Sequence, residues 1–224
     1  MRSIKLFCRM RKFIRGYKAL LLFVGLCVIL GAAIGSVFAD GSSDRGLNPG
    51  GTFITLGGVF LPQMWTEINC ADIVKASPKR RMIGAETHVI VSSIGFFLLF
   101  TLALCIQFLN GSLGAEARAV NMLCVALWVF LLMCYASAAC KGMVLSSVLF
   151  ILFSILLQTC GPRVLQWWEG IHGPIFGGST ALTILVCYLI LILGMAAQYL
   201  LTVLLYKKEV DKYSVNIYLR QYMR

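Results

Sequence analysis

The amino-acid sequence predicts an all-α integral membrane protein, built as a four-transmembrane-helix bundle with a small extracellular lobe. Three observations support this expectation. Hydrophobic residues make up 59% of the 224 positions and charged residues only 13%, which is far from the composition of soluble globular domains. Apolar stretches long enough to cross a bilayer recur along the chain, and basic residues gather in two tails. We expect a single domain over residues 1–224, because this length leaves no room for a further soluble domain of ordinary size.

The first predicted elements are a basic tail over residues 1–18 and a membrane span over residues 19–38. The tail contains seven Lys and Arg residues, and its Cys8 is a candidate for palmitoylation near the membrane. About 20 apolar residues cross a hydrocarbon core of about 30 Å, a length that residues 19–38 reach. Gly31 and Gly35 stand four positions apart in this span, a spacing that lets another helix approach closely in lipid. A cleaved signal peptide is the alternative, but the length of the apolar run favours an uncleaved span.

Residues 40–86 are predicted to form an outer loop, and the second span follows over residues 88–109. The loop contains five basic and five acidic residues and is therefore neutral. Its run from Thr52 to Phe60 is rich in β-branched and aromatic residues, which favour a strand. We therefore expect the loop to form the extracellular lobe, with short β-strands in it.

The apolar region 119–160 is the ambiguous part of the topology. It contains 42 residues, with Lys141 and Gly142 in its middle. As one helix it would extend about 63 Å, so that Lys141 would anchor among the outer headgroups and the remainder would leave the hydrocarbon core. As two spans it would turn at Lys141 and Gly142 and give five crossings in total. We favour residues 119–160 as one long third span and keep five crossings as the alternative.

The chain then continues as an outer loop over residues 161–179, a fourth span over residues 181–205 and a tail over residues 206–224. Trp167 and Trp168 in the loop are expected to anchor at the headgroup layer. The tail contains five Lys and Arg residues. Short basic flanks remain on the cytoplasmic side, so both termini are expected in the cytoplasm, as an even number of spans allows. The plasma membrane is expected rather than an internal membrane.

The nine cysteines are not spaced like a metal site, and no Cys-x-x-Cys pair is present. Five of them lie within apolar stretches, where Cys behaves as a small apolar residue. Cys70 and Cys160 belong to the outer side of the four-span topology, where an oxidising environment permits a disulfide bond between them. Cys140 lies near the same boundary and is an equally placed partner. Two free thiols are the alternative, and the five-span topology excludes the bond between Cys70 and Cys160.

The sequence contains no recognisable catalytic or cofactor-binding constellation. Only His88 and His172 are available as imidazole ligands, and neither has a second histidine at ligand spacing on the same helix. We therefore expect no enzyme activity, no cofactor, no metal and no small-molecule substrate. The net charge of +11 comes largely from tails beside the membrane, a pattern typical of contact with anionic lipid rather than nucleic acid. Asn121 and Gln198 are expected to form hydrogen bonds between spans.

The segment FITLGG, residues 53–58, carries a family resemblance. It matches the first-loop signature of the amastin surface proteins at Ile54, Thr55, Leu56 and Gly58, whereas a glycine replaces the signature tryptophan and the flanking cysteines are missing. Together with the order of long outer loop, very short inner loop and second outer loop, the chain resembles the claudin-like tetraspan superfamily. The resemblance implies a four-span fold and a role as cell-contact component, surface antigen or auxiliary subunit, and it assigns no site residue.

These observations predict a non-enzymatic multi-pass membrane protein. Its partners would be the lipid bilayer, other membrane proteins or further copies of itself, in an adhesion or assembly role or as auxiliary subunit of a membrane complex. The alternative is an oligomeric channel or pore-forming subunit, in which Lys141, Gln198 or Glu86 would line a water path. A pore lining requires a continuous polar stripe along a span, and none of the predicted spans has one.

Overall fold

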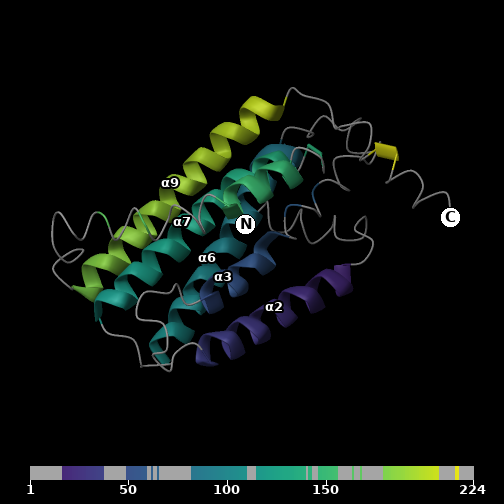
Figure 1. The fold of residues 1–224 in the computed structure, drawn as a ribbon. Coiled ribbons are helices and arrows are strands. Elements are labelled where there is room, and N and C mark those ends of the chain that lie inside the picture. Colours follow the sequence, from purple (N-terminus) through teal and green to yellow (C-terminus); the bar gives the residue numbers. More distant parts are fainter. Residues whose placement is uncertain are drawn as a thin grey trace.

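A computed structural model describes residues 17–37, 49–59, 62, 65, 82–109, 115–139, 141–142, 146–155, 163, 167, 179–206 and 215–216. The elements in these ranges are helical (Figure 1): α2 (Tyr17–Val37), α3 (Pro49–Leu56), the 3-10 helix η2 (Gly57–Val59), the π-helix η3 (Met82–Thr87), α6 (His88–Leu109), α7 (Ala115–Ala139) and α9 (Thr180–Tyr206). A shorter apolar helix covers Ser146–Ile155.

Three helices in the described chain are long and apolar enough to cross a membrane, namely Ala85–Leu109, Ala117–Ala139 and Thr180–Leu205. The prediction of an all-α membrane protein is therefore confirmed at this level. Within the most apolar 18-residue stretch of each helix, the share of residues buried inside the protein is 78% for α7, 39% for α6 and 22% for α9. The helix α7 is thus the centre of the bundle, and α9 lies at its periphery.

The helices α7 and α9 run in the same direction, whereas α6 runs in the opposite direction. Along α7, Met133 lies against Gly194 and Ser137 contacts Gln198 and then Thr202, so both residue numbers increase together. Between α6 and α9 the order is reversed, because Ser93 contacts Gln198 and Thr101 contacts Tyr188.

The helices α2 and α3 form an antiparallel pair beside α6. Gly50 at the start of α3 lies against Gly35 near the end of α2, and Gly57 after α3 lies against Val24. Gly58 packs against Phe96 of α6, whereas the start of α3 shares a cavity with the last turns of α6. Consequently α3 runs antiparallel to α6, and α2 runs parallel to α6.

These directions give the bundle two ends, which we call proximal and distal. At the proximal end α2 and α6 begin, and α7 and α9 end. At the distal end α2 and α6 end, and α3, α7 and α9 begin. In Figure 1 the proximal end lies towards the upper right and the distal end towards the lower left. The described chain therefore enters the bundle at α2 and leaves it at α9 at the same end.

The long apolar region does not form one helix, which corrects the sequence-based expectation of a continuous helix over residues 119–160. The helix α7 ends at Ala139, where the amides of Lys141 and Gly142 both donate to the Ala138 carbonyl at 2.9 and 3.3 Å. Continuing straight, the helix would place Phe150 about 22 Å beyond Tyr135. Instead the Phe150 ring lies 5.9 Å from the ring of Tyr135 and 5.9 Å from that of Trp128. The chain reverses at Lys141 and Gly142, and the helix Ser146–Ile155 packs back along α7.

The expectation of a β-strand over Thr52 to Phe60 is also wrong, because the described residues up to Val59 are helical. Ile54 and Thr55 are almost fully buried. Glycines on the facing side of α2 allow the α3 backbone to approach, so α3 packs inside the bundle. This part of the expected outer lobe is therefore a buried helix.

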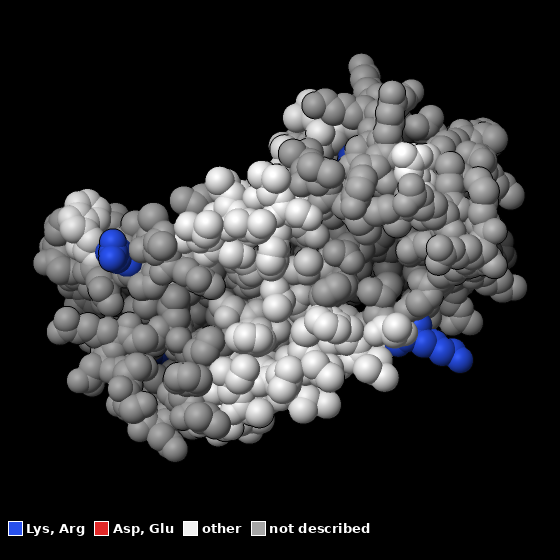
Figure 2. Space-filling model, turned by 45° about the vertical axis from the view of Figure 1, so that its right-hand side comes forward, with Lys and Arg blue, Asp and Glu red and all other residues white. Residues whose placement is uncertain are grey.

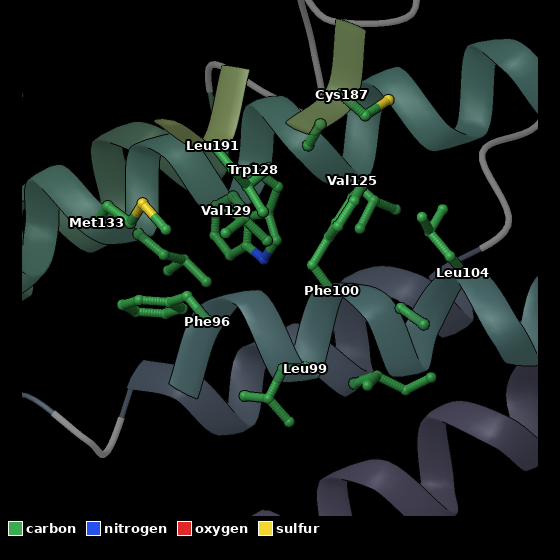
Figure 3. Packing of buried hydrophobic residues seen from close by; sticks show 14 of the residues in the cluster. Phe96, Leu99, Phe100, Leu104, Val125, Trp128, Val129, Met133, Cys187 and Leu191 are labelled. Atoms are coloured by element: carbon green, nitrogen blue, oxygen red, sulfur yellow. The ribbon is translucent and has the colours of Figure 1, made fainter. Parts of the chain in front are cut away.

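The hydrophobic core lies between α6, α7 and α9 (Figure 3). Phe96 and Phe100 of α6 point towards Val129 and Met133 of α7, and Leu191 of α9 closes the cluster from the other side. All five side chains are fully buried. Aromatic rings also connect α6 to α9, since Tyr188 stacks on Phe97 and meets Phe100 edge-on.

Candidate functional site

A buried polar cluster joins α6, α7 and α9 near the proximal end. Its centre is Gln198 of α9, whose amide oxygen accepts from the Ser93 hydroxyl at 3.1 Å and whose amide nitrogen donates to the Ser92 hydroxyl at 2.6 Å. On the α7 side the Ser137 hydroxyl donates to the Gln198 carbonyl at 3.0 Å and accepts from Thr202 at 3.2 Å. Each of these five side chains is at most 2% exposed.

This polar cluster satisfies its hydrogen-bonding groups internally. The Ser92 hydroxyl accepts from Gln198 and itself donates to the His88 backbone carbonyl at 2.7 Å. An unpaired amide or hydroxyl in an apolar interior costs several kcal/mol, so the two serines of α6 fix both the depth and the rotation of Gln198. The prediction that Gln198 forms hydrogen bonds between spans is confirmed.

His88 lies above this cluster, at the start of α6. Its side chain is fully buried, and no described residue donates to or accepts from either ring nitrogen. The Trp65 ring meets it edge-on at 5.5 Å, and the Lys141 ammonium lies close enough for its charge to act on the imidazole. A positive charge therefore acts on this polar region.

A small cavity of about 20 Å³ lies near the distal end. It is lined by glycines of α2 and α3 and by Gln107 of α6 and Asn121 of α7. The Gln107 amide donates weakly to the Arg118 carbonyl at 3.4 Å. A volume of this size accommodates about one water molecule, so this cavity can hydrate the two amides and cannot hold an organic ligand.

The polar cluster and the distal cavity are separated by the apolar core. Phe96, Phe100, Val129, Met133 and Leu191 fill the level between them and have no exposed surface. Among the described residues, the polar cluster and the cavity are thus not joined by a continuous polar path. Thr55 and Thr183 are also buried, but their hydroxyls donate to backbone carbonyls four residues earlier in their own segments.

The glycines of the first predicted span lie at a close helix contact. A Cβ atom added to Gly31 would stand 2.8 Å from the Gly50 carbonyl oxygen, and one added to Gly50 would stand 2.6 Å from the Gly35 Cα. The backbones of α2 and α3 touch here, which side chains larger than hydrogen would prevent.

The other predicted site residues fall in different places. Lys141 is half-buried in the turn that follows α7, at the proximal end, and Trp167 is exposed. Cys8, Cys70, Cys160 and Trp168 lie outside the described residues. Five described cysteines are free thiols in the helices: Cys27, Cys105, Cys124, Cys134 and Cys187.

Sequence reasoning missed the hydroxyl residues that complete the polar cluster. Serine and threonine are common in membrane helices, where their hydroxyls usually bond to the backbone of their own helix. This gave no reason to single out Ser92, Ser93, Ser137 and Thr202. The adjacent pair Ser92-Ser93 inside an apolar run was the available signal, because Ser and Gln side chains form hydrogen bonds between membrane helices. Which amide they meet depends on the packing of α9.

Comparison of the chain with protein families, with curated proteins and with solved structures finds no match. The claudin and amastin resemblance therefore rests on the motif in residues 53–58 and on the order of apolar segments.

Proposed function

We propose that this chain is a non-enzymatic multi-pass membrane protein that works through contacts with other membrane proteins and lipids, as an assembly component or auxiliary subunit of a membrane complex. The observation that carries the proposal is the sealed apolar layer between the two interior polar regions. A conducting subunit needs a water path through its own interior or along a polar surface stripe. The polar cluster is bonded to itself and serves helix packing instead.

The outward surfaces of the helices support the same proposal. Exposed leucine, isoleucine and phenylalanine side chains cover the outer sides of α2, α6 and α9, and α9 has the smallest buried share of the three candidate spans. In Figure 2 the described residues in the middle of one face carry no charge, and Lys and Arg lie towards the two ends of that face. Such a zone suits lipid chains or the helix of a partner protein.

For orientation we propose that the protein lies in the plasma membrane with both termini on the cytoplasmic side. The described chain enters and leaves the bundle at the proximal end, and the segments before Tyr17 and after Tyr206 are the two basic tails. Lys- and Arg-rich flanks favour the cytoplasmic side. The helix α2 has 21 residues, long enough for about 32 Å, and we include it among the crossing helices.

A photo-crosslinking experiment tests the contact role. A photoreactive residue replaces Leu189 on the outer side of α9, and a matched variant carries it at the fully buried Leu191. In cells at native abundance, the Leu189 variant should give discrete adducts with another protein or a second copy, whereas the Leu191 variant should give only internal products. Absence of discrete adducts at Leu189 and at the equally exposed Ile192 contradicts the proposal.

A conductance measurement tests the alternative. Purified full-length protein in a planar bilayer should give no unitary currents beyond those of protein-free bilayers. Reproducible currents whose amplitude changes in a Gln198→Leu variant would show that the polar cluster lines a path, and would replace the contact role by a pore.

A further inference from the structure

In the part of the chain that the structure describes, the positions of the helix ends imply six passages between the two ends of the bundle. After α2 reaches the distal end, α3 starts back there, and Trp65 lies at the proximal end against His88. The helix α7 finishes at the proximal end and α9 begins at the distal end. Residues 49–65 and the stretch between α7 and α9 therefore each make a passage, in addition to α2, α6, α7 and α9.

Basic residues adjoin four of the helix ends at the proximal side. Lys18 stands in the first turn of α2, and Lys141 follows the end of α7. In the sequence, α9 is followed at once by Lys207-Lys208, and η3 is preceded by Lys79-Arg80-Arg81. Four helix ends that are far apart in the sequence, and that packing brings to one side, thus have basic residues next to them. Glu86 of η3 is an acidic residue at the same side.

The distal side has a different balance of acidic and basic residues. The sequence between α2 and α3 contains Asp40, Asp44 and Arg45, and the first turn of α7 contains Glu116 and Arg118. Acidic residues outnumber basic ones there. An excess of Lys and Arg in short flanks marks the cytoplasmic side, and the cytoplasmic leaflet is the one rich in anionic lipids.

We propose that the proximal end of the bundle is a cytoplasmic binding surface for anionic lipid headgroups, with Lys141 at a central contact. Lys141 is half-buried in the turn after α7, and a lysine at such a position can keep its stem on the protein while its ammonium extends to the headgroup layer. It stands between the end of α7 and the start of the helix Ser146–Ile155. The inference rests on the proposed function and names the class of lipid that makes its contacts. It places Lys141 on the cytoplasmic side of the membrane, whereas the four-span topology places it on the outer side.

The lipid contact is tested by thermal unfolding of the purified full-length protein in mixed micelles. Phosphatidylserine should raise the midpoint relative to phosphatidylcholine. The rise should shrink by half or more in a Lys141→Ala variant and persist in Lys141→Arg and in Arg118→Ala, which removes a distal charge. It should also weaken between low and high salt, because salt screens exposed charges. An equal rise in Lys141→Ala overturns the proposal, and an equal rise with inorganic phosphate alone makes the surface a free-anion site.

The orientation is tested by labelling with a membrane-impermeant maleimide, with the parent protein as background. A Lys141→Cys variant should react only when the plasma membrane has been permeabilised, and labelling in intact cells overturns the cytoplasmic assignment. An Ala117→Cys variant, at an exposed position of α7 near its distal start, is the matched control and should react in intact cells. Neither result depends on whether the protein conducts ions, so this inference and the contact role fail separately.

Discussion

Replacing Gln198 by leucine should weaken the packing of α9 on α6 and α7. The substitution removes the two side-chain hydrogen bonds to Ser92 and Ser93, at 2.6 and 3.1 Å, while keeping most of the side-chain volume. Hydrogen bonds between membrane helices average about 0.6 kcal/mol and reach about 1.7 kcal/mol. Two of them give about 1.2 kcal/mol, with an upper bound of about 3.4 kcal/mol.

The lower part of this range is expected because both serines keep other options. Ser92 already donates to the His88 carbonyl at 2.7 Å, and the Ser93 hydroxyl can turn to a carbonyl of its own helix. The free energy of unfolding is measured by titration with a denaturing detergent, followed by the fluorescence of the four tryptophans. Gln107→Leu is the matched control, since its amide makes only a 3.4 Å contact, and its effect should stay below about 0.5 kcal/mol.

A double-mutant cycle isolates the contact itself. Gln198→Leu, Ser93→Ala and the double variant should show a coupling energy of about 0.6 kcal/mol. The reasoning is refuted if the Gln198→Leu variant is as stable as the parent and the coupling is zero, because the polar cluster would then contribute nothing to the association of the three helices.

Two further substitutions test the close contacts of the fold. Gly50→Ala should destabilise the protein by about 1–3 kcal/mol, since the added Cβ would stand 2.6 Å from the Gly31 carbonyl oxygen, whereas Gly25→Ala meets nothing within 4 Å and should be neutral; equal effects in the same detergent titration contradict the α2–α3 contact. Phe150→Ala should cost up to about 3 kcal/mol through lost packing on α7, and the exposed Ile151→Ala should cost little, an order that a straight helix beyond Lys141 would not produce.

The parts of the fold that follow from local composition were predictable. The apolar segments 19–38, 88–109 and 181–205 coincide within two residues with α2, α6 and α9, because the length of an apolar run and its flanking polar residues mark helix ends without reference to the rest of the chain. The role of Gln198 was predictable for a similar reason: a lone amide in an apolar span must find a partner. Its partners were not, since serines at many positions would serve equally.

The direction of each segment was decided only by the tertiary structure. Hydropathy does not indicate in which direction a segment runs, so the apolar run around Lys141 fits a long helix and a hairpin equally well. The packing of Phe150 against Trp128 and Tyr135 selects the hairpin.

The glycine-rich run after Pro49 was equally undecided by its sequence. Glycine weakens both helix and strand in isolation, and here the run becomes helical where Gly31 and Gly35 of α2 let its backbone come close. Thus the sequence determined by itself that the protein belongs in a membrane and where most helices lie, since burial in lipid depends on composition alone. The tertiary structure decided which loops enter the bundle and which ends share a side, because those outcomes depend on contacts between residues far apart in the chain.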